Sequence, residues 1–273
     1  MSKHSVVRIP HPNEEGCAVA GILEQTEEVT VTKGRAIALI LHGTAGHKDY
    51  LYQKRLARTL PIDSFRFDFR GNHETPGTWR TDALDDDVAD LAAVVAYLRG
   101  HLGYRIALLV GHSRGSIVGF RWMCTAPEAQ EVDGFVNVSG RYRMRVHSPA
   151  GQAWQREIAE KGAALWTPVV ARRQLALRVT AADLAAFAAF DTSLVWDHFP
   201  AHVAVLTVHG LADLTVPPYD AVIYARALGG RAPGTHTLHL MEDAGHNFEG
   251  GRGRGRGQLR DGVWGEHGKE ARL

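Results

Sequence analysis

Short apolar runs alternate with longer amphipathic segments along most of the chain. Residues 36–42 and 106–110 are apolar at nearly every position, which is typical of strands buried on both faces of a sheet. Residues 82–99 instead place their apolar side chains on one stripe, as an amphipathic helix does. This alternation predicts an α/β fold with a mostly parallel, doubly wound sheet of about eight strands. The candidate strands are 6–10, 17–23, 36–42, 64–68, 106–110, 135–138, 203–208 and 237–241.

Two parts of the chain depart from this alternation. Residues 141–200 have helical propensity, three tryptophans and no strong strand, and about sixty residues is far longer than a usual connection. We therefore predict a helical lid inserted into a catalytic domain of residues 1–248; the alternative is an ordinary crossover with extra helices. Residues 249–273 open with the run EGGRGRGRG, which cannot bury apolar surface, so a disordered Gly/Arg-rich tail is expected there.

Composition and charge narrow the class of protein. The chain has 273 residues, 45% of them apolar, and 31 Lys and Arg against 30 Asp and Glu give a formal net charge of +1. This balance argues against a disordered polyelectrolyte and against a broadly basic nucleic-acid-binding surface. Two cysteines, Cys17 and Cys124, are too few for a disulfide framework, which fits a reducing compartment. Residues 1–10 lack an apolar signal region and no apolar stretch approaches about 18 residues, so we expect a cytoplasmic protein without a membrane span.

The strongest chemical signal is the sequence GHSRG at residues 111–115. It matches G-x-S-x-G and lies between the candidate strand 106–110 and the amphipathic segment 116–124. A tight turn at the carboxyl end of a strand exposes a serine hydroxyl where a base can reach it. The helix that follows directs its first N–H groups toward the reacting centre. Ser113 is therefore the candidate nucleophile, and the N–H of Arg114 is a candidate oxyanion donor.

A second oxyanion donor is expected from the loop after an earlier strand. The apolar run 36–41 leads directly into HGTAG at residues 42–46, which is small and rich in glycine. The N–H of Thr44 is our candidate donor. The same His-Gly pair is equally compatible with a plain strand-to-helix turn, so both interpretations stay open.

A base and an orienting acid are expected at the carboxyl ends of later strands. Asp213 follows the strand 203–208 within HGLADLTVP, and His246 follows the strand 237–241 within AGHNF. The order Ser113, Asp213, His246 is that of enzymes with a nucleophile elbow. Asp243 is a rival acid, but it would need a chain reversal to reach the ring of His246. No histidine or cysteine shows zinc-ligand spacing, so neither a metal nor a cofactor is expected.

These four blocks, GHSRG, the HG of residues 42–43, HGLADLTVP and AGHNF, resemble those of the α/β-hydrolase superfamily over roughly residues 17–248. LHGTAGHKDYLYQKRLARTL followed by SFRFDFRGNHET is similar to an esterase-like branch with cinnamoyl and feruloyl esterases and serine peptidase-like proteins. The resemblance implies that Ser113 is the nucleophile, His246 the general base and then acid, and Asp213 the carboxylate that fixes the histidine tautomer. A serine at position 113 argues against dehalogenases and epoxide hydrolases, which use aspartate.

The expected function is hydrolysis of a small or medium carboxylic ester through an acyl-serine, with a small-molecule substrate and no membrane partner. Peptidase or thioesterase action is the nearest alternative, because the acyl chemistry is shared. A catalytically silent binding protein is another, and contact of the Arg-Gly tail with nucleic acid is a third. The sequence carries no prediction of the oligomeric state.

Three further features of the sequence bear on the region around the candidate site. Arg141, Arg143 and Arg145 alternate just after a strand, so they either face an acidic substrate or lie on a solvated surface. Asp68 and Arg70 are interpreted as scaffold ion-pair residues rather than substrate ligands. The closing helix that usually follows the base loop in the superfamily is not evident after Phe248, which predicts a less constrained loop around His246.

Overall fold

A central sheet of eight strands organises the chain in the computed structural model, which describes residues 3–12, 14–28, 31–145 and 148–249. The strand order is β1-β2-β4-β3-β5-β6-β11-β12. The pairs β1/β2 and β2/β4 are antiparallel, and the remaining pairs are parallel. The strands are β1 (Lys3–Pro10), β2 (Ala18–Gln25), β3 (Ala36–Leu41), β4 (Asp63–Phe67), β5 (Arg105–His112), β6 (Gly134–Val138), β11 (Ala204–Gly210) and β12 (His236–Met241).

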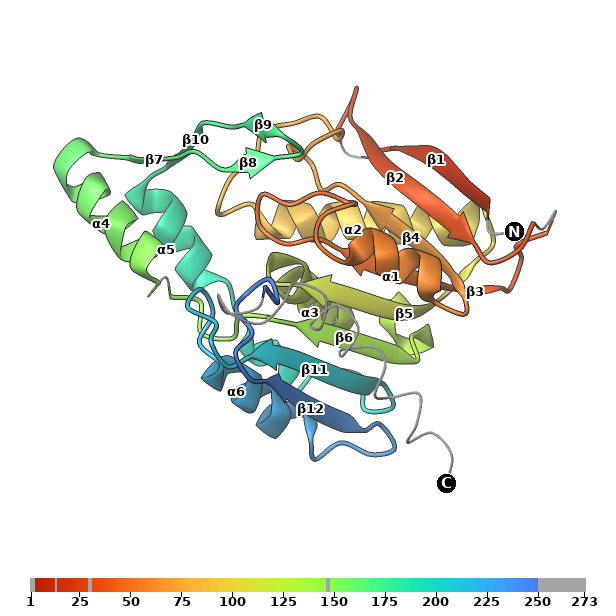
Figure 1. Cartoon of the computed structure of the whole chain (residues 1–273). Coiled ribbons are helices and arrows are strands. Elements are labelled where there is room, and N and C mark those ends of the chain that lie inside the picture. The colour runs from red at the N-terminus through yellow and green to blue at the C-terminus, as the bar shows by residue number, and fades with distance from the viewer. Residues whose placement is uncertain (1–2, 13, 29–30, 146–147, 250–273) are drawn as a thin grey trace.

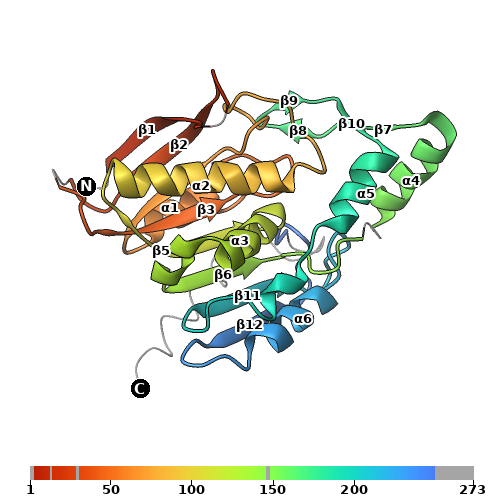
Figure 2. The ribbon, with the colours of Figure 1, turned by 180° about the vertical axis from the view of Figure 1, so that it is seen from behind.

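Helices cover both faces of this sheet (Figures 1 and 2). One face carries α1 (Gln53–Thr59), and the other carries α2 (Leu84–Gly100), α3 (Arg114–Thr125) and α6 (Tyr219–Leu228). The 3-10 helix η1 (Pro127–Glu131) follows α3. The α/β fold predicted from the sequence is confirmed, and each of the eight candidate strands overlaps a strand of the sheet. Among the described residues, no helix is both long and apolar enough to cross a bilayer.

The core has two parts because consecutive strand side chains point to opposite faces. Leu39 and Leu41 of β3 join the larger apolar cluster beneath α2, α3 and α6, whereas Ile40 joins a smaller cluster beneath α1. Phe248, near the end of the described chain, packs against this smaller cluster. That contact fixes the chain just beyond the predicted base loop.

Residues 141–200 connect β6 to β11 and project from the end of the sheet at which the parallel strands finish (Figure 1). The segment contains two α-helices, as expected, and also short strands that the sequence did not indicate, which pair as β7 with β10 and as β8 with β9. Ala171 and Arg172 form the turn of the β8/β9 hairpin, with φ of 47° and 68°. Asn and Gly are the residues usually found at such left-handed positions. The elements are α4 (Pro149–Lys161), β7 (Ala164–Trp166), β8 (Val169–Val170), β9 (Arg173–Gln174), β10 (Leu177–Val179), α5 (Ala181–Ala189) and η2 (Ser193–Val195).

The division into a catalytic domain of residues 1–248 and a tail of residues 249–273 stays a prediction. Apart from Glu249, the predicted tail lies outside the described residues.

Candidate active site

Ser113 occupies a sharp turn between β5 and α3. Its φ is 52°, in the left-handed region that serine rarely adopts, and its N–H donates to the carbonyl of Val138 at 2.8 Å. A Cβ added at Gly111 would lie 2.6 Å from the carbonyl oxygen of Gly115, and one added at Gly115 would lie 2.6 Å from the carbonyl oxygen of Leu41. Both glycines therefore allow the close backbone packing that holds Ser113 in its strained conformation.

Two side chains from later loops reach Ser113. The Nε2 atom of His246 lies 2.9 Å from the Oγ atom of Ser113, and its Nδ1 atom lies 2.8 Å from the Oδ2 atom of Asp213. The imidazole can thus accept the serine proton at one nitrogen while a carboxylate holds the other. The structure brings together the three residues that the sequence singled out.

Asp213 is held as an ionised acceptor. Its Oδ1 atom accepts the backbone N–H groups of Thr215 and Val216, each at 2.8 Å, and its side chain is fully buried. Burial raises the pKa of this carboxyl, but hydrogen bonds from His209, His246 and the backbone outweigh burial and hold the pKa well below its usual range. Asp213 therefore carries a negative charge next to His246.

The backbone carbonyl of His246 accepts hydrogen bonds from two side chains. Nε2 of His112 lies 3.1 Å from the backbone oxygen of His246, and the hydroxyl of Ser139 lies 3.2 Å from the same oxygen. Ser139 also adopts a left-handed conformation, with φ of 51°, directly after β6. The loop that carries the imidazole is thus tied to the turn that carries Ser113, although the sequence predicted a poorly constrained loop.

The two oxyanion candidates belong to segments that lie next to Ser113. Arg114 is the first residue of α3, so its N–H faces out of the helix end, and its guanidinium is turned away toward Asp87 and the carbonyl of Thr81. The loop of residues 42–46 lies against the turn, because a Cβ added at Gly43 would be 3.2 Å from the Cβ of Ser113. Thr44 follows Gly43 in this loop, and its role as a donor stays a prediction.

A family model described as "Alpha/beta hydrolase family" matches residues 38–250, which include all of these site residues. The chain belongs to the alpha/beta hydrolase family. An uncharacterized protein of Saccharomyces cerevisiae is 28% identical over 250 residues, which cover 80% of this chain and 70% of the yeast protein.

Solved structures of similar fold include other alpha/beta hydrolases. A hydrolase from Agrobacterium vitis matches with a TM-score of 0.67 and 18% identity over 90% of this chain and 92% of its own. Esterase Pf2001 from Pyrococcus furiosus matches with a TM-score of 0.66 and 16% identity over 98% of this chain and 88% of its own. Est1E from Butyrivibrio proteoclasticus, solved with ferulic acid, matches with a TM-score of 0.64 and 17% identity over 89% of this chain and 92% of its own. At these identities the likeness shows the shared fold.

The other residues that the sequence left open lie away from the contact between Ser113 and His246. Asp243 is exposed in the loop before His246, whereas Asp213 makes the carboxylate contact. Both interpretations of the alternating arginines fail for Arg141, which is buried and donates to the backbone oxygens of Arg145 and Thr215. Arg143 pairs with Asp220 at 2.7 Å.

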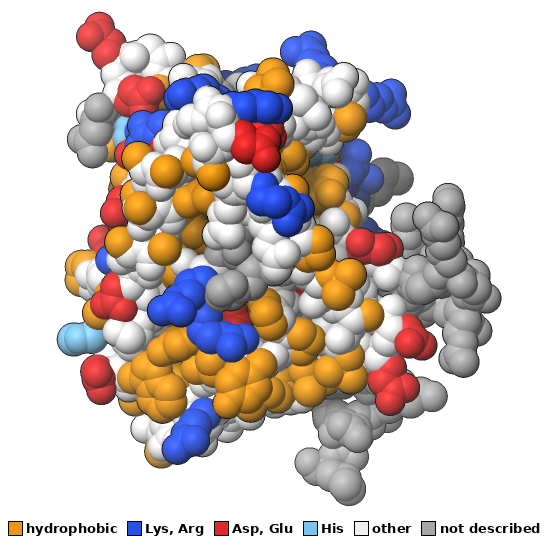
Figure 3. Space-filling model, turned by 90° about the vertical axis from the view of Figure 1, so that its left-hand side faces the viewer, with side chains coloured by type: hydrophobic (Ala, Val, Ile, Leu, Met, Phe, Trp, Pro, Cys, Tyr) orange, Lys and Arg blue, Asp and Glu red, His pale blue; other side chains and the backbone are white. Residues whose placement is uncertain are grey.

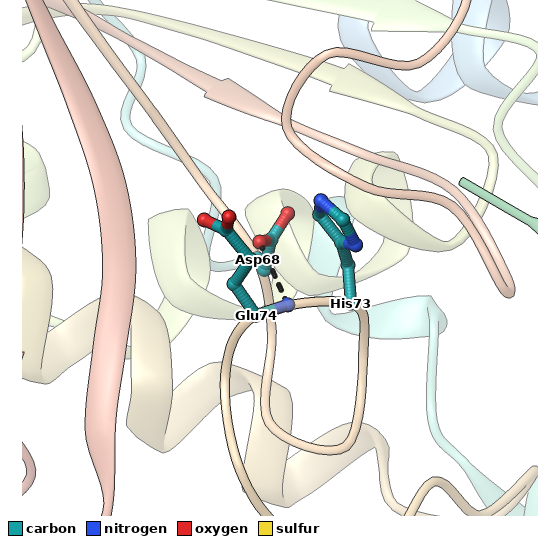
Figure 4. A group of neighbouring side chains, drawn as sticks. All are labelled: Asp68, His73 and Glu74. Atoms are coloured by element: carbon teal, nitrogen blue, oxygen red, sulfur yellow. Dashed lines mark hydrogen bonds between the residues drawn. The ribbon is translucent and has the colours of Figure 1, made fainter. Parts of the chain in front are cut away.

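Asp68 and Arg70 do form ion pairs, as expected. Arg70 lies 2.7 Å from Asp90. Asp68 gathers with His73 and Glu74 closely enough to suggest a metal site (Figure 4). However, the buried Nζ atom of Lys48 lies 2.6 Å from Asp68 and 2.7 Å from Glu74. This ammonium offsets one of the two negative charges, and the guanidinium of Arg8 lies 3.8 Å from Glu74, so the cluster is an ion-pair network that is buried at Asp68 and exposed at Glu74.

Sequence reasoning missed three residues that contact the proposed machinery: His112, Ser139 and His209. All three are buried polar side chains. The positions of the two histidines offered a signal, because His112 directly precedes Ser113 and His209 is four residues before Asp213 at the end of β11. Ser139 carried no local signal, since its contact with residue 246 spans 107 positions.

Proposed function

We propose that this alpha/beta hydrolase is a serine esterase that cleaves small or medium carboxylic esters through an acyl-serine intermediate. The observation that carries the proposal is the continuous contact from Ser113 Oγ through His246 to Asp213, at 2.9 Å and 2.8 Å. Such a chain activates a hydroxyl that would otherwise be a poor nucleophile at neutral pH.

In the first half of the reaction, Ser113 Oγ attacks the ester carbonyl carbon while its proton passes to Nε2 of His246. Asp213 stabilises the resulting imidazolium and keeps Nδ1 protonated. The N–H groups of Arg114 and Thr44 are the proposed donors to the negative carbonyl oxygen of the tetrahedral intermediate. The intermediate collapses as the C–O bond to the alcohol breaks and His246 returns the proton to the leaving alkoxide.

In the second half, a water molecule attacks the acyl-serine. His246 takes one proton from this water, and the second tetrahedral intermediate releases the carboxylic acid as the proton returns to Ser113 Oγ. Every proton in this cycle is carried by Ser113, His246 or water, so the proposed chemistry needs only side chains of this protein and one water molecule.

Exposed apolar side chains close to the loop of Asp213 support an ester with an apolar acyl or alcohol group. Figure 3 shows the side of the molecule that lies at the left of Figure 1, and apolar side chains gather on the lower part of this face beside Lys and Arg side chains. Leu214 and Tyr219 are 77% and 61% exposed. Two of the structurally similar proteins are esterases, and one of them was solved with ferulic acid, which supports a carboxylic ester as the substrate class. We further propose that residues 141–200 act as the lid over the end of the sheet at which the parallel strands finish.

The proposal is tested with a fluorophosphonate probe, which labels activated serines. We expect the folded wild-type protein to be labelled and to hydrolyse p-nitrophenyl acetate, and Ser113→Ala to lose both properties. Ser64→Ala is the matched control, because Ser64, near the start of β4, is also buried but donates its hydrogen bond to the carbonyl of Ala57 in α1. A folded wild-type protein that neither reacts with the probe nor hydrolyses esters would replace the proposal with a silent binding fold.

A substrate panel separates the enzyme alternatives. Esters, thioesters and aminoacyl amides of the same acyl group differ only in the leaving group, which the pocket selects. Faster turnover of a thioester or an amide than of the matched ester would assign the chain to thioesterases or peptidases instead.

A further inference from the structure

A second histidine contacts the acid of the proposed triad. The Nε2 atom of His209 lies 3.2 Å from Oδ2 of Asp213, the same oxygen that faces His246 at 2.8 Å. His209 is the penultimate residue of β11, and the loop that follows curls back so that residue 213 lies over the strand end. Both side chains are fully buried, so this contact is shielded from water.

The backbone fixes which nitrogen of His209 carries hydrogen. The same Nε2 atom lies 3.0 Å from the carbonyl oxygen of Val216, which can only accept a hydrogen bond. Nε2 is therefore the protonated nitrogen, and its hydrogen is shared between Val216 and Asp213. Nδ1 of His209 is buried without a hydrogen-bond partner among the described residues. The ring thus faces Asp213 as a donor.

We propose that His209 is a positioning residue that holds Asp213 Oδ2 in place and takes up part of its negative charge, which sets how strongly Asp213 attracts a proton on His246. The inference rests on the proposed function, since His209 acts on the reaction only through Asp213 and His246. A carboxylate that loses a donor becomes a stronger acceptor for its remaining partner. Removing the His209 donor should therefore favour the protonated form of His246.

Other charged and titratable groups around the pair stay constant in this comparison. The His112 ring from β5 lies 5.3 Å from that of His246, and the guanidinium of Arg141, after β6, attracts Asp213. In the base loop, Glu249 lies beside Gly245, and Glu242 and Asp243 are exposed. None of these groups is altered by a substitution at position 209.

The experiment compares His209→Phe with His209→Gln. Phenylalanine keeps a ring and removes the donor, whereas glutamine keeps an N–H donor. In wild-type enzyme, kcat/KM for p-nitrophenyl acetate should rise with pH as His246 loses its proton. We expect the midpoint to move upward by roughly half to one pH unit in His209→Phe, and the plateau to fall about tenfold. His209→Gln should restore most of the wild-type midpoint.

The matched control is His202→Phe. His202 also bonds a backbone carbonyl, that of Val132, at 3.2 Å, but it precedes β11, whereas His209 lies at the other end of the strand, next to the site. Its pH profile should equal that of wild type. A His209→Phe profile that coincides with the control would overturn the inference and leave the esterase proposal standing.

A second measurement needs no turnover. Nitrogen NMR of histidine-labelled wild-type protein should show His209 with hydrogen on Nε2 only, and the titration of His246 can be followed in every folded variant. Hydrogen on Nδ1 of His209 instead would overturn the inference, even if His209→Phe failed to fold. Wild-type protein that titrates as expected but neither reacts with the fluorophosphonate nor hydrolyses esters would overturn the proposed function alone.

Discussion

The Nε2 atom of His112 lies 3.1 Å from the backbone oxygen of His246, so the residue directly before Ser113 holds the main chain of the proposed base. Ser139 donates to the same oxygen. Because an imidazole displaced by about an ångström can cost on the order of 100-fold in rate, these two donors should matter for catalysis without contacting substrate.

We expect Ser139→Ala and His112→Phe each to lower kcat by about 10- to 100-fold and to change KM little, because the loop of His246 gains freedom. Steady-state kinetics with p-nitrophenyl acetate give both constants. Ser64→Ala, which removes a buried serine hydrogen bond away from the site, should keep the wild-type kcat. Wild-type kcat in both site variants would show that other contacts position the imidazole.

Alanine in place of Gly111 or Gly115 should disrupt the turn at Ser113. Each new Cβ would lie 2.6 Å from a backbone oxygen, and backbone cannot yield as a flexible side chain can. We expect a loss of about 1–3 kcal/mol in the free energy of unfolding, together with loss of fluorophosphonate labelling. Gly100→Ala is the control, because a Cβ at this last residue of α2 meets nothing within 4 Å. It should be neutral or stabilising by up to about 1 kcal/mol.

Mild acid should destabilise the protein through histidines that are buried in the neutral form. Burial lowers the pKa of His42 to about 4 and that of His112 to about 3, whereas an unfolded histidine titrates near about 6.5. The unfolded chain therefore binds more protons in this window, so the stability contributed by each histidine is complete above about pH 6.5 and is lost as pH falls. At about pH 5 the loss is on the order of 2 kcal/mol for each histidine.

Urea unfolding at about pH 7.5 and pH 5 measures this difference. His42→Gln should reduce the stability difference between the two pH values, because glutamine does not titrate. Its amide can still hydrogen-bond the backbone groups of Phe69 and Gly43 that contact His42. Asp213 contributes in a separate, more acidic window: its pKa is depressed in the folded state, so its contribution is lost only below about pH 3.9. Equal stability at the two pH values would contradict the assignment of buried, neutral histidines.

Trp166 of β7 should contribute to acyl-chain preference if residues 141–200 form a lid. Its ring lies 5.6 Å from that of Trp79 and 5.5 Å from that of Trp154. Trp79 is two residues before Thr81, whose carbonyl accepts from Arg114 beside Ser113. We expect Trp166→Ala to lower kcat/KM about tenfold for long or aromatic acyl groups and to leave acetate nearly unchanged. An equal loss for all p-nitrophenyl esters would contradict a role in acyl selection.

The parts of the fold that follow local rules could be predicted from the sequence. The strand-turn-helix setting of GHSRG located Ser113, and Asp213 was favoured over Asp243 because Asp243, three residues before His246, would need a chain reversal to reach its ring. The hairpin at Ala171 and Arg172 could not be predicted, because its turn needs two successive residues in the left-handed conformation and neither alanine nor arginine favours that conformation. Contacts such as Ser139 with His246 depend on side chains that meet only after the sheet has formed, so no local pattern encodes them.

Arg141 gives residues 141–200 a fixed stem. Its buried guanidinium bonds the carbonyl of Arg145 on one side and that of Thr215, two residues beyond Asp213, on the other. A graft that exchanges this insertion between related enzymes should therefore keep position 141 and join the foreign sequence after it. Grafts that replace Arg141 would loosen the loop of Asp213. A change in their substrate range would then reflect the disturbed loop rather than the properties of the grafted insertion.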